Sequence, residues 1–246
     1  MILEVCVDSL ASARAAIRGG ASRLELCSAL SIGGLTPYIA LLEQIRQESS
    51  IPVRCLMRPR AGDFLYTKEE ILQMAREIRM LHTAGASGFV IGCLTPDGDL
   101  DKEAMKPLLA AAEGAGLTLH RCIDVSRNPE KTYLEAGVLG IDTVLTSGGA
   151  ISCSAGIETI GRLLSLRDQG GPEVLIGAGV NAEVIQVFRS RFPNAAAFHM
   201  SGKTERESGM RFRREGIPMG IPGFDEWHIQ QTSEDAVRSA RTALKQ

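Results

Sequence analysis

Hydrophobic positions along the chain follow two alternating patterns. Short apolar runs with strand-like alternation are each followed by a longer segment in which apolar residues recur every three or four positions. This order is typical of βαβ units and a parallel sheet. Strands are predicted at 2–7, 23–26, 53–57, 89–93, 118–123, 143–146, 174–176 and 197–200. Helices are predicted at 9–18, 38–48, 68–83, 102–113, 129–136, 155–167, 182–191 and 234–244.

Several of these helices begin with residues that favour a helix start. Thr67 precedes the third helix, and Glu70 stands three positions later, which is the spacing of a capping box. Asn181 and Ser233 stand directly before two other predicted helices and have side chains that can accept from the first free N–H groups. The helix boundaries are therefore supported by capping chemistry as well as by periodicity.

Eight strand–helix units fit two folds, a closed (β/α)8 TIM barrel and an open, doubly wound Rossmann-like sheet. Strand starts recur about every thirty residues, roughly the length of one βα unit, and this even spacing favours the barrel. No G-x-G-x-x-G opens the first helix, so the usual Rossmann fingerprint is missing. The sequence predicts an α/β barrel with one domain, 1–246, and a long loop at 202–232 before the last helix.

The charge balance of the chain argues against nucleic acid and membranes as binding partners. The chain has 27 basic and 29 acidic residues and a net charge of -2, which offers no excess positive charge for nucleic acid or an anionic membrane. No apolar run reaches the length of a membrane span, and the first residues lack a signal-peptide pattern. The six cysteines show no C-x-x-C spacing, so reduced thiols and a cytoplasmic location are expected.

Strand parity brings charged and sulfur-bearing side chains to one face. Glu4 and Cys6 alternate with apolar residues on the first predicted strand, and Glu25 and Cys27 do so on the second. The third strand offers Arg54 and Arg58 as counter-charges to these carboxylates. Because a barrel lumen is packed and dry, such charges need partners. A structural ion network and a catalytic one both fit this pattern.

Residues at the carboxyl ends of barrel strands are the better candidates for chemistry, because active sites of this fold lie there. Arg58, His120 and Asp124 stand at such ends and are the candidate catalytic residues. The spacing of His120 and Asp124 suggests an acid/base histidine with an orienting carboxylate, although a buried core histidine is the alternative.

Glycine-rich turns after the last three strands suggest an anion site, because exposed N–H groups of such loops bind phosphate in many barrels. Glycines also occur simply because βα turns are tight. The candidate substrate or anion-binding residues are Glu25, Arg60, Asp63, Arg121, Ser147, Gly148, Gly179, His199 and Lys203.

Cys27 stands at a strand end before a polar, glycine-rich loop, and Cys6 shares its face on the neighbouring strand. Two thiolates in such a position suit Cu(I), the soft metal ion. The competing interpretation is that these thiols pack as small apolar groups, since free cysteine is among the most buried residues. Copper is thus a candidate ligand, and no other cofactor is indicated.

Together these motifs resemble one family, the copper homeostasis protein CutC family of (β/α)8 barrels, over nearly the whole chain. The residues that show the resemblance are Glu4–Val7, Leu24–Ser28, Gly33–Pro37, Arg58–Arg60, Gly62–Phe64, Tyr66, His120, Arg121, Asp124, Leu145–Gly149, Phe198, His199, Ser208–Met210, Phe212 and Arg213. The resemblance implies a cytoplasmic protein linked by name to copper tolerance, with Cu(I) bound through cysteines. Cys55, Cys93, Cys122 and Ile123 depart from the usual pattern and are interpreted as neutral core variation.

Two functions follow. The first is Cu(I) binding in copper homeostasis, and the second is an enzyme of unknown reaction acting on a small anionic metabolite, phosphorylated or not. The expected partner is accordingly a small anion or a copper ion, with a homo-oligomer as a further expectation.

Overall fold

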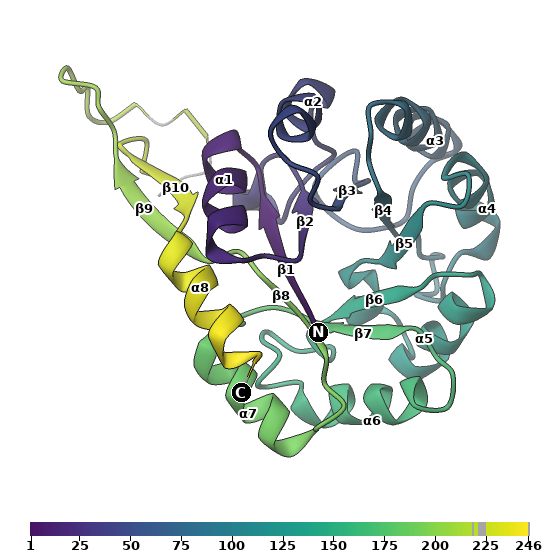
Figure 1. Cartoon of the computed structure of the whole chain (residues 1–246). Coiled ribbons are helices and arrows are strands. Elements are labelled where there is room, and N and C mark those ends of the chain that lie inside the picture. Colours follow the sequence, from purple (N-terminus) through teal and green to yellow (C-terminus); the bar gives the residue numbers. More distant parts are fainter. Residues whose placement is uncertain (218, 221–224, 246) are drawn as a thin grey trace.

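The computed structural model describes residues 1–217, 219–220 and 225–245. Eight parallel strands form a closed barrel in chain order, with β8 hydrogen-bonded back to β1 (Figure 1). The predicted TIM barrel is confirmed, and closure excludes the open Rossmann-like sheet. The strands are β1 Ile2–Val7, β2 Arg23–Leu26, β3 Val53–Leu56, β4 Gly88–Ile91, β5 Gly116–Leu119, β6 Thr143–Thr146, β7 Glu173–Ile176 and β8 Ala197–Met200.

Eight α-helices alternate with the strands of the barrel and form its outer ring (Figure 1). The predicted capping box is present: Thr67 accepts from the Glu70 N–H, and the Glu70 carboxylate accepts from the Thr67 N–H. Asn181 and Ser233 cap their helices as expected. The helices are α1 Leu10–Gly19, α2 Ile39–Glu48, α3 Lys68–Thr83, α4 Lys102–Ala111, α5 Pro129–Val138, α6 Ile157–Arg167, α7 Ala182–Arg191 and α8 Glu234–Ala243. Among the described residues, no helix has the length and apolar character needed to cross a membrane.

The fifth strand is shorter than predicted. β5 ends at Leu119, and a 3-10 helix, η2 Arg121–Val125, follows it in place of the last residues of the expected strand 118–123. The His120 ring stops the strand, because its Nδ1 accepts a hydrogen bond from the Cys122 N–H at 3.2 Å and caps η2. Asp124 therefore lies in η2 and does not continue the strand from His120 as their spacing had suggested.

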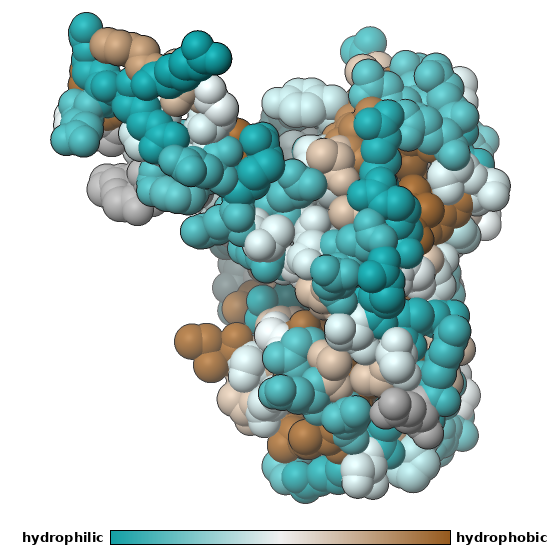
Figure 2. All heavy atoms as spheres, turned by 60° about the vertical axis from the view of Figure 1, so that its left-hand side comes forward, coloured by the Kyte–Doolittle hydropathy of each residue, from teal (hydrophilic) through white to brown (hydrophobic). Residues whose placement is uncertain are grey.

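The segment predicted as a long loop at 202–232 contains a two-stranded antiparallel ribbon. β9 Lys203–Glu207 pairs with β10 His228–Thr232, and the ribbon projects from the barrel beside α1 and α8 (Figure 1). Its surface is mainly hydrophilic (Figure 2). Positions 218 and 221–224 of the predicted loop lie outside the described residues.

The barrel lumen contains charged side chains as well as apolar ones. Arg54 of β3 donates to Thr118 on β5 at 2.6 Å and to Asp142 before β6 at 2.8 Å. A β-carbon at Gly116 would lie 2.6 Å from an Arg54 guanidinium nitrogen, so this glycine makes room for the arginine. This ion pair lies at the amino-terminal end of the lumen, and the cavity described below lies at the carboxyl end.

Candidate functional site

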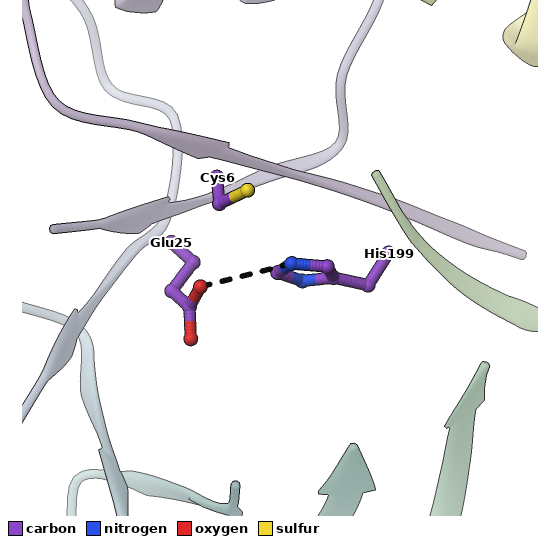
Figure 3. Close-up of side chains that lie close together, drawn as sticks. All are labelled: Cys6, Glu25 and His199. Carbon is purple, nitrogen blue, oxygen red and sulfur yellow. Dashed lines mark ion pairs between the residues drawn. The ribbon is translucent and has the colours of Figure 1, made fainter. Parts of the chain in front are cut away.

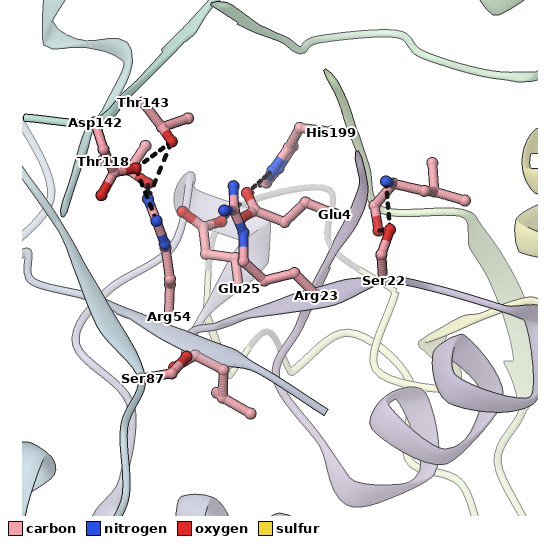
Figure 4. Close-up of polar contacts among 12 residues, drawn as sticks. Glu4, Ser22, Arg23, Glu25, Arg54, Ser87, Thr118, Asp142, Thr143 and His199 are labelled. Carbon is pink, nitrogen blue, oxygen red and sulfur yellow. Dashed lines mark hydrogen bonds and ion pairs between the residues drawn. The ribbon is translucent and has the colours of Figure 1, made fainter. Parts of the chain in front are cut away.

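A buried ion network occupies the lumen between β1, β2 and β8 (Figure 4). Glu4 is fully buried, and one of its oxygens accepts from Arg23 Nε at 2.5 Å. The other lies 2.8 Å from Nδ1 of His199. Register explains the arrangement, because Glu4 is directly opposite Arg23 on one side and His199 on the other. The Glu4 carboxylate therefore fixes the orientation of the His199 ring.

The pKa values of this network follow from burial and charge. Burial alone would raise the pKa of the Glu4 carboxyl, but the His199 hydrogen bond and the Arg23 charge outweigh it and lower that pKa to about 2. Burial alone would lower the pKa of His199, but Cys6, Glu25 and Glu4 hold it well above its usual value. At neutral pH the network contains an ionised Glu4 and a protonated His199.

The low pKa of Glu4 predicts a loss of stability in acid. Its ordinary value is 4.5, so the contribution of this ionised group to stability is complete above pH 4.5 and disappears as the pH falls through about 2. Over that window we expect the free energy of unfolding to fall by roughly 3 kcal/mol because of Glu4. Denaturant titrations of wild type and Glu4→Gln at successive pH values measure the difference. An equally steep acid dependence in both proteins would contradict the assignment.

A second cluster of side chains lies between this ion network and the cavity. One ligand atom each from Cys6, Glu25 and His199 lies within 4.8 Å of the other two (Figure 3). The Glu25 carboxylate is 3.7 Å from His199 Nε2 and accepts a hydrogen bond from the Cys27 thiol at 3.5 Å. Burial raises the pKa of Glu25, and burial together with Glu25 raises that of Cys27 far above its usual value. These atoms form the candidate metal site.

The two cysteines predicted as ligands lie in one apolar cluster with Leu56 and Val90. Cys6 reaches the cavity, whereas Cys27 is 1% exposed and lies behind it. The sequence did not predict that a Glu25 oxygen and a His199 nitrogen lie within 4.8 Å of the Cys6 sulfur.

A cavity of about 390 Å³ opens at the carboxyl end of the barrel, where the catalytic sites of this fold lie. Its wall also contains apolar side chains, among them Leu30, Leu56 and Phe64. The predicted site residues that line it are Cys6, Glu25, Arg58, His120, Arg121, Gly179, His199 and Lys203. Residues from distant parts of the chain thus converge on one pocket.

Arg58 and His120 are held rigidly on the cavity wall. The Arg58 guanidinium donates to the carbonyl oxygens of Ile32, Gly34 and Gly62, which joins the loops after β2 and β3. The His120 ring lies 4.7 Å from the Phe64 ring, centroid to centroid. Burial and the Arg58 charge lower the pKa of His120 to about 3, so the ring is neutral at pH 7.

Asp124 does not orient His120. Its carboxylate accepts from the Ser147 and Gly149 N–H groups and from the Thr146 hydroxyl, and it pairs with Arg121 at 2.7 Å. The glycine-rich loop after β6 therefore does bind an anion, but that anion is the protein's own carboxylate. This differs from the open cradle expected from the sequence.

The remaining predicted residues lie away from the cavity. Ser147 and Gly148 are held in the Asp124 loop, where the Gly148 N–H donates to Thr146 at 2.9 Å. Arg60 turns outward to Glu70 and Asp63, at 2.6 and 3.1 Å. Fewer of the predicted site residues therefore lie at the cavity than the sequence suggested.

Sequence reasoning missed two contributors. Arg23, and not Arg54 or Arg58, is the hydrogen-bonded counter-charge of Glu4; its position two residues before Glu25 gives it the same strand parity. Phe64 contacts both Arg58 and His120, and it belongs to the R-P-R-x-G-D-F segment that carried the resemblance. Strand parity was the available signal for Arg23, and membership in this segment was the available signal for Phe64.

Comparisons with known proteins agree with this architecture. The CutC family model matches residues 1–204. A CutC family protein of Vibrio parahaemolyticus is 40% identical over 245 residues, which cover 99% of this chain and 98% of the relative. The human copper homeostasis protein cutC homolog is 39% identical over 245 residues, or 99% of this chain and 89% of the human one.

Solved structures show the same fold. The CutC of Streptococcus agalactiae superposes with a TM-score of 0.75 at 27% identity, covering 82% of this chain and 98% of that one. A phosphoribosylanthranilate isomerase from Pyrococcus furiosus reaches a TM-score of 0.56 at 16% identity over 100% of this chain and 98% of its own, which shows the barrel alone. With the family model and the curated relatives in agreement, the chain belongs to the CutC family.

Proposed function

We propose that the protein acts in copper homeostasis by binding one Cu(I) ion at the carboxyl end of the barrel, with Cys6 and Cys27 as thiolate ligands and His199 beside them. The grouping of the Cys6 sulfur, a Glu25 oxygen and a His199 nitrogen within 4.8 Å supports Cys6 and His199 as ligands. Cys27 shares an apolar cluster with Cys6 and is proposed as the second thiolate. Thiolate and imidazole are ligands that suit copper. We also propose a cytoplasmic location, because all six cysteines are free and thiols persist in a reducing compartment.

The surroundings of His199 fit a metal ligand. Metal-binding histidines usually donate their second ring N–H to a carboxylate, and Glu4 accepts from Nδ1 of His199 at 2.8 Å. This leaves Nε2 on the side of Cys6 and Glu25. Cu(I) would displace the Nε2 proton and the thiol protons, so we expect binding to release protons.

Cu(I) titration of the reduced protein against a competing chelator tests this function. We expect Cys6→Ala and Cys27→Ala each to weaken Cu(I) binding by at least about tenfold, since each removes one soft ligand. Cys55→Ala is the matched control, because Cys55 is a fully buried strand thiol that packs in the outer core instead of the lumen. Equal affinity in all three variants would exclude the site.

We propose as a second candidate an enzyme that acts on a small anionic metabolite in the same cavity. A volume of about 390 Å³ is far larger than a bare metal ion requires, and Arg58, Arg121 and Lys203 contribute positive charge to its wall. Polar groups gathered around such a cavity at the carboxyl end of a barrel are typical of catalysis.

A thermal-shift screen of anionic metabolites tests the enzyme candidate, because a ligand that binds only the folded protein raises its melting temperature. We expect at least one small acid to stabilise wild type and to have less effect on Lys203→Ala, which removes an exposed positive charge at the cavity mouth. Arg206→Ala, a change elsewhere on β9, is the control. A uniformly inert library would count against this function.

A further inference from the structure

Hydrogen-bond donors with no partner among the described residues lie at the rim of the cavity, on the loops that follow β7 and β8. In the loop after β7, the Ala178 and Gly179 N–H groups donate to no other residue that the structure describes. In the loop after β8, the Ser201 hydroxyl and the Lys203 ammonium group make no hydrogen bond or ion pair within the described ranges. All four residues line the cavity, and Gly179 and Lys203 are exposed. A ligand that enters from solvent can therefore reach this rim.

Strand register brings the two loops together. The last paired positions of β7 and β8 lie three residues before Gly179 and three residues before Ser201. One position beyond that pair, a β-carbon at Gly177 would lie 3.6 Å from the β-carbon of His199, so the two chains are still adjacent where they leave the sheet. The donors of the two loops are therefore neighbours at the carboxyl end of the barrel.

Arg121 adds a fixed guanidinium group to this rim. Its Nε donates to Asp124 at 2.7 Å and its Nη2 donates to Ser147 at 2.8 Å, whereas Nη1 has no partner in the described part of the chain. The Arg121 side chain lines the cavity and is 44% exposed. Ser147 directly follows β6, whose neighbour in the barrel is β7. A guanidinium group held in this way binds an anion with little loss of side-chain freedom.

We propose that the loops after β7 and β8, together with Arg121, form the subsite for the phosphate group of a small phosphate monoester. Phosphate commonly binds at the loops after the seventh and eighth strands of such barrels. The loop after β6 is already occupied by the Asp124 carboxylate, so the next two loops are the ones that remain open. This inference rests on the second proposed function, because it names the anionic group of that substrate, and it does not depend on copper.

The number and kind of the donors favour phosphate over carboxylate. Backbone N–H groups, a hydroxyl, an ammonium and a guanidinium group come from three separate segments of the chain. A phosphate group presents three terminal oxygens in different directions, whereas a planar carboxylate presents two in one plane. Among the described residues that line the cavity, Glu25 is the one acidic residue, and it lies with His199 in the candidate metal site. The body of the substrate would face that end of the cavity.

Backbone NMR of the copper-free protein tests the subsite, with glycerol 3-phosphate, inorganic phosphate and glycerate as probes. We expect glycerol 3-phosphate to shift the Gly179 N–H signal, because a new hydrogen bond to a charged oxygen forms there. The Gly149 N–H is the internal control, since it already donates to Asp124 at 3.0 Å and should shift less. Inorganic phosphate should shift the same Gly179 signal but bind more weakly, because it lacks the body that contacts the rest of the cavity.

Calorimetric titration with glycerol 3-phosphate measures the contribution of Lys203. We expect Lys203→Met to weaken binding roughly tenfold or more, because a hydrogen bond between two charged groups is lost. Arg206→Met is the matched control, since it removes a positive charge further along the exposed β9 and should leave the affinity unchanged.

A Gly179 signal that responds to neither phosphate probe, or equal affinities of the two variants, overturns the subsite. Glycerate that binds where glycerol 3-phosphate does not overturns the phosphate class, while the enzyme candidate stands. Inorganic phosphate that binds more tightly than its glycerol ester overturns the monoester. If none of the three probes binds and the thermal-shift library is also inert, both the subsite and the enzyme candidate are wrong.

Discussion

Replacing Glu4 by glutamine is expected to lower the free energy of unfolding by about 3–5 kcal/mol at pH 7, the usual cost of removing one partner from a buried ion pair. The reason is that Arg23 and the protonated His199 would remain in the lumen without their counter-charge. Urea denaturation at neutral pH measures the change.

The control for Glu4→Gln is Glu48→Gln at the surface. Glu48 also pairs with an arginine, Arg14, at 2.5 Å, but both side chains are largely exposed to solvent. Exposed ion pairs contribute little to stability, so we expect almost no change there. If the two substitutions had similar effects, the lumen network would not be the stabilising feature that its burial indicates.

Gly148→Ala is expected to destabilise the protein by about 3–4 kcal/mol, because it adds overpacking to left-handed backbone strain. Gly148 has a φ of +75°, and a β-carbon there would overlap the carbonyl oxygen of Gly156, which belongs to the backbone. The loop that Asp124 holds would have to move. Chemical denaturation measures the loss of stability.

Gly114→Ala separates the two causes. Gly114 has a similar φ of +80°, but no atom lies within 4 Å of the β-carbon position. Backbone strain alone should cost about 1 kcal/mol at this position. Equal losses in both variants would show that the contact with Gly156 has no energetic consequence.

Part of the site could be predicted from strand alternation. On β1 the apolar Leu3 and Val5 alternate with Glu4 and Cys6, and the barrel places the latter pair in the lumen, as parity required. The same reasoning placed Glu25 on that face of β2. Alternation is reliable here because a strand has a side-chain period of two and each of these strands is regular.

Alternation failed where the strand ended early. At His120 the apolar and β-branched residues that follow continue to resemble a strand, yet the ring accepts from the Cys122 N–H and η2 begins. A hydrogen bond between a side chain and the nearby backbone competes with the sheet, and local sequence does not show which will form. Asp124 consequently lies in the β6 loop and not beside His120.

By itself the sequence determined the eight βα units, the closed barrel and part of the set of polar residues at its carboxyl end, because these depend on periodicity and local capping. Tertiary structure alone decided which charged side chains pair with one another. Arg54 faces Glu25 in the strand register, yet its guanidinium reaches Asp142 through the space left at Gly116, and Arg23 neutralises Glu4 instead. Long side chains choose among several partners across a lumen, and only the register and the free volume between strands settle that choice.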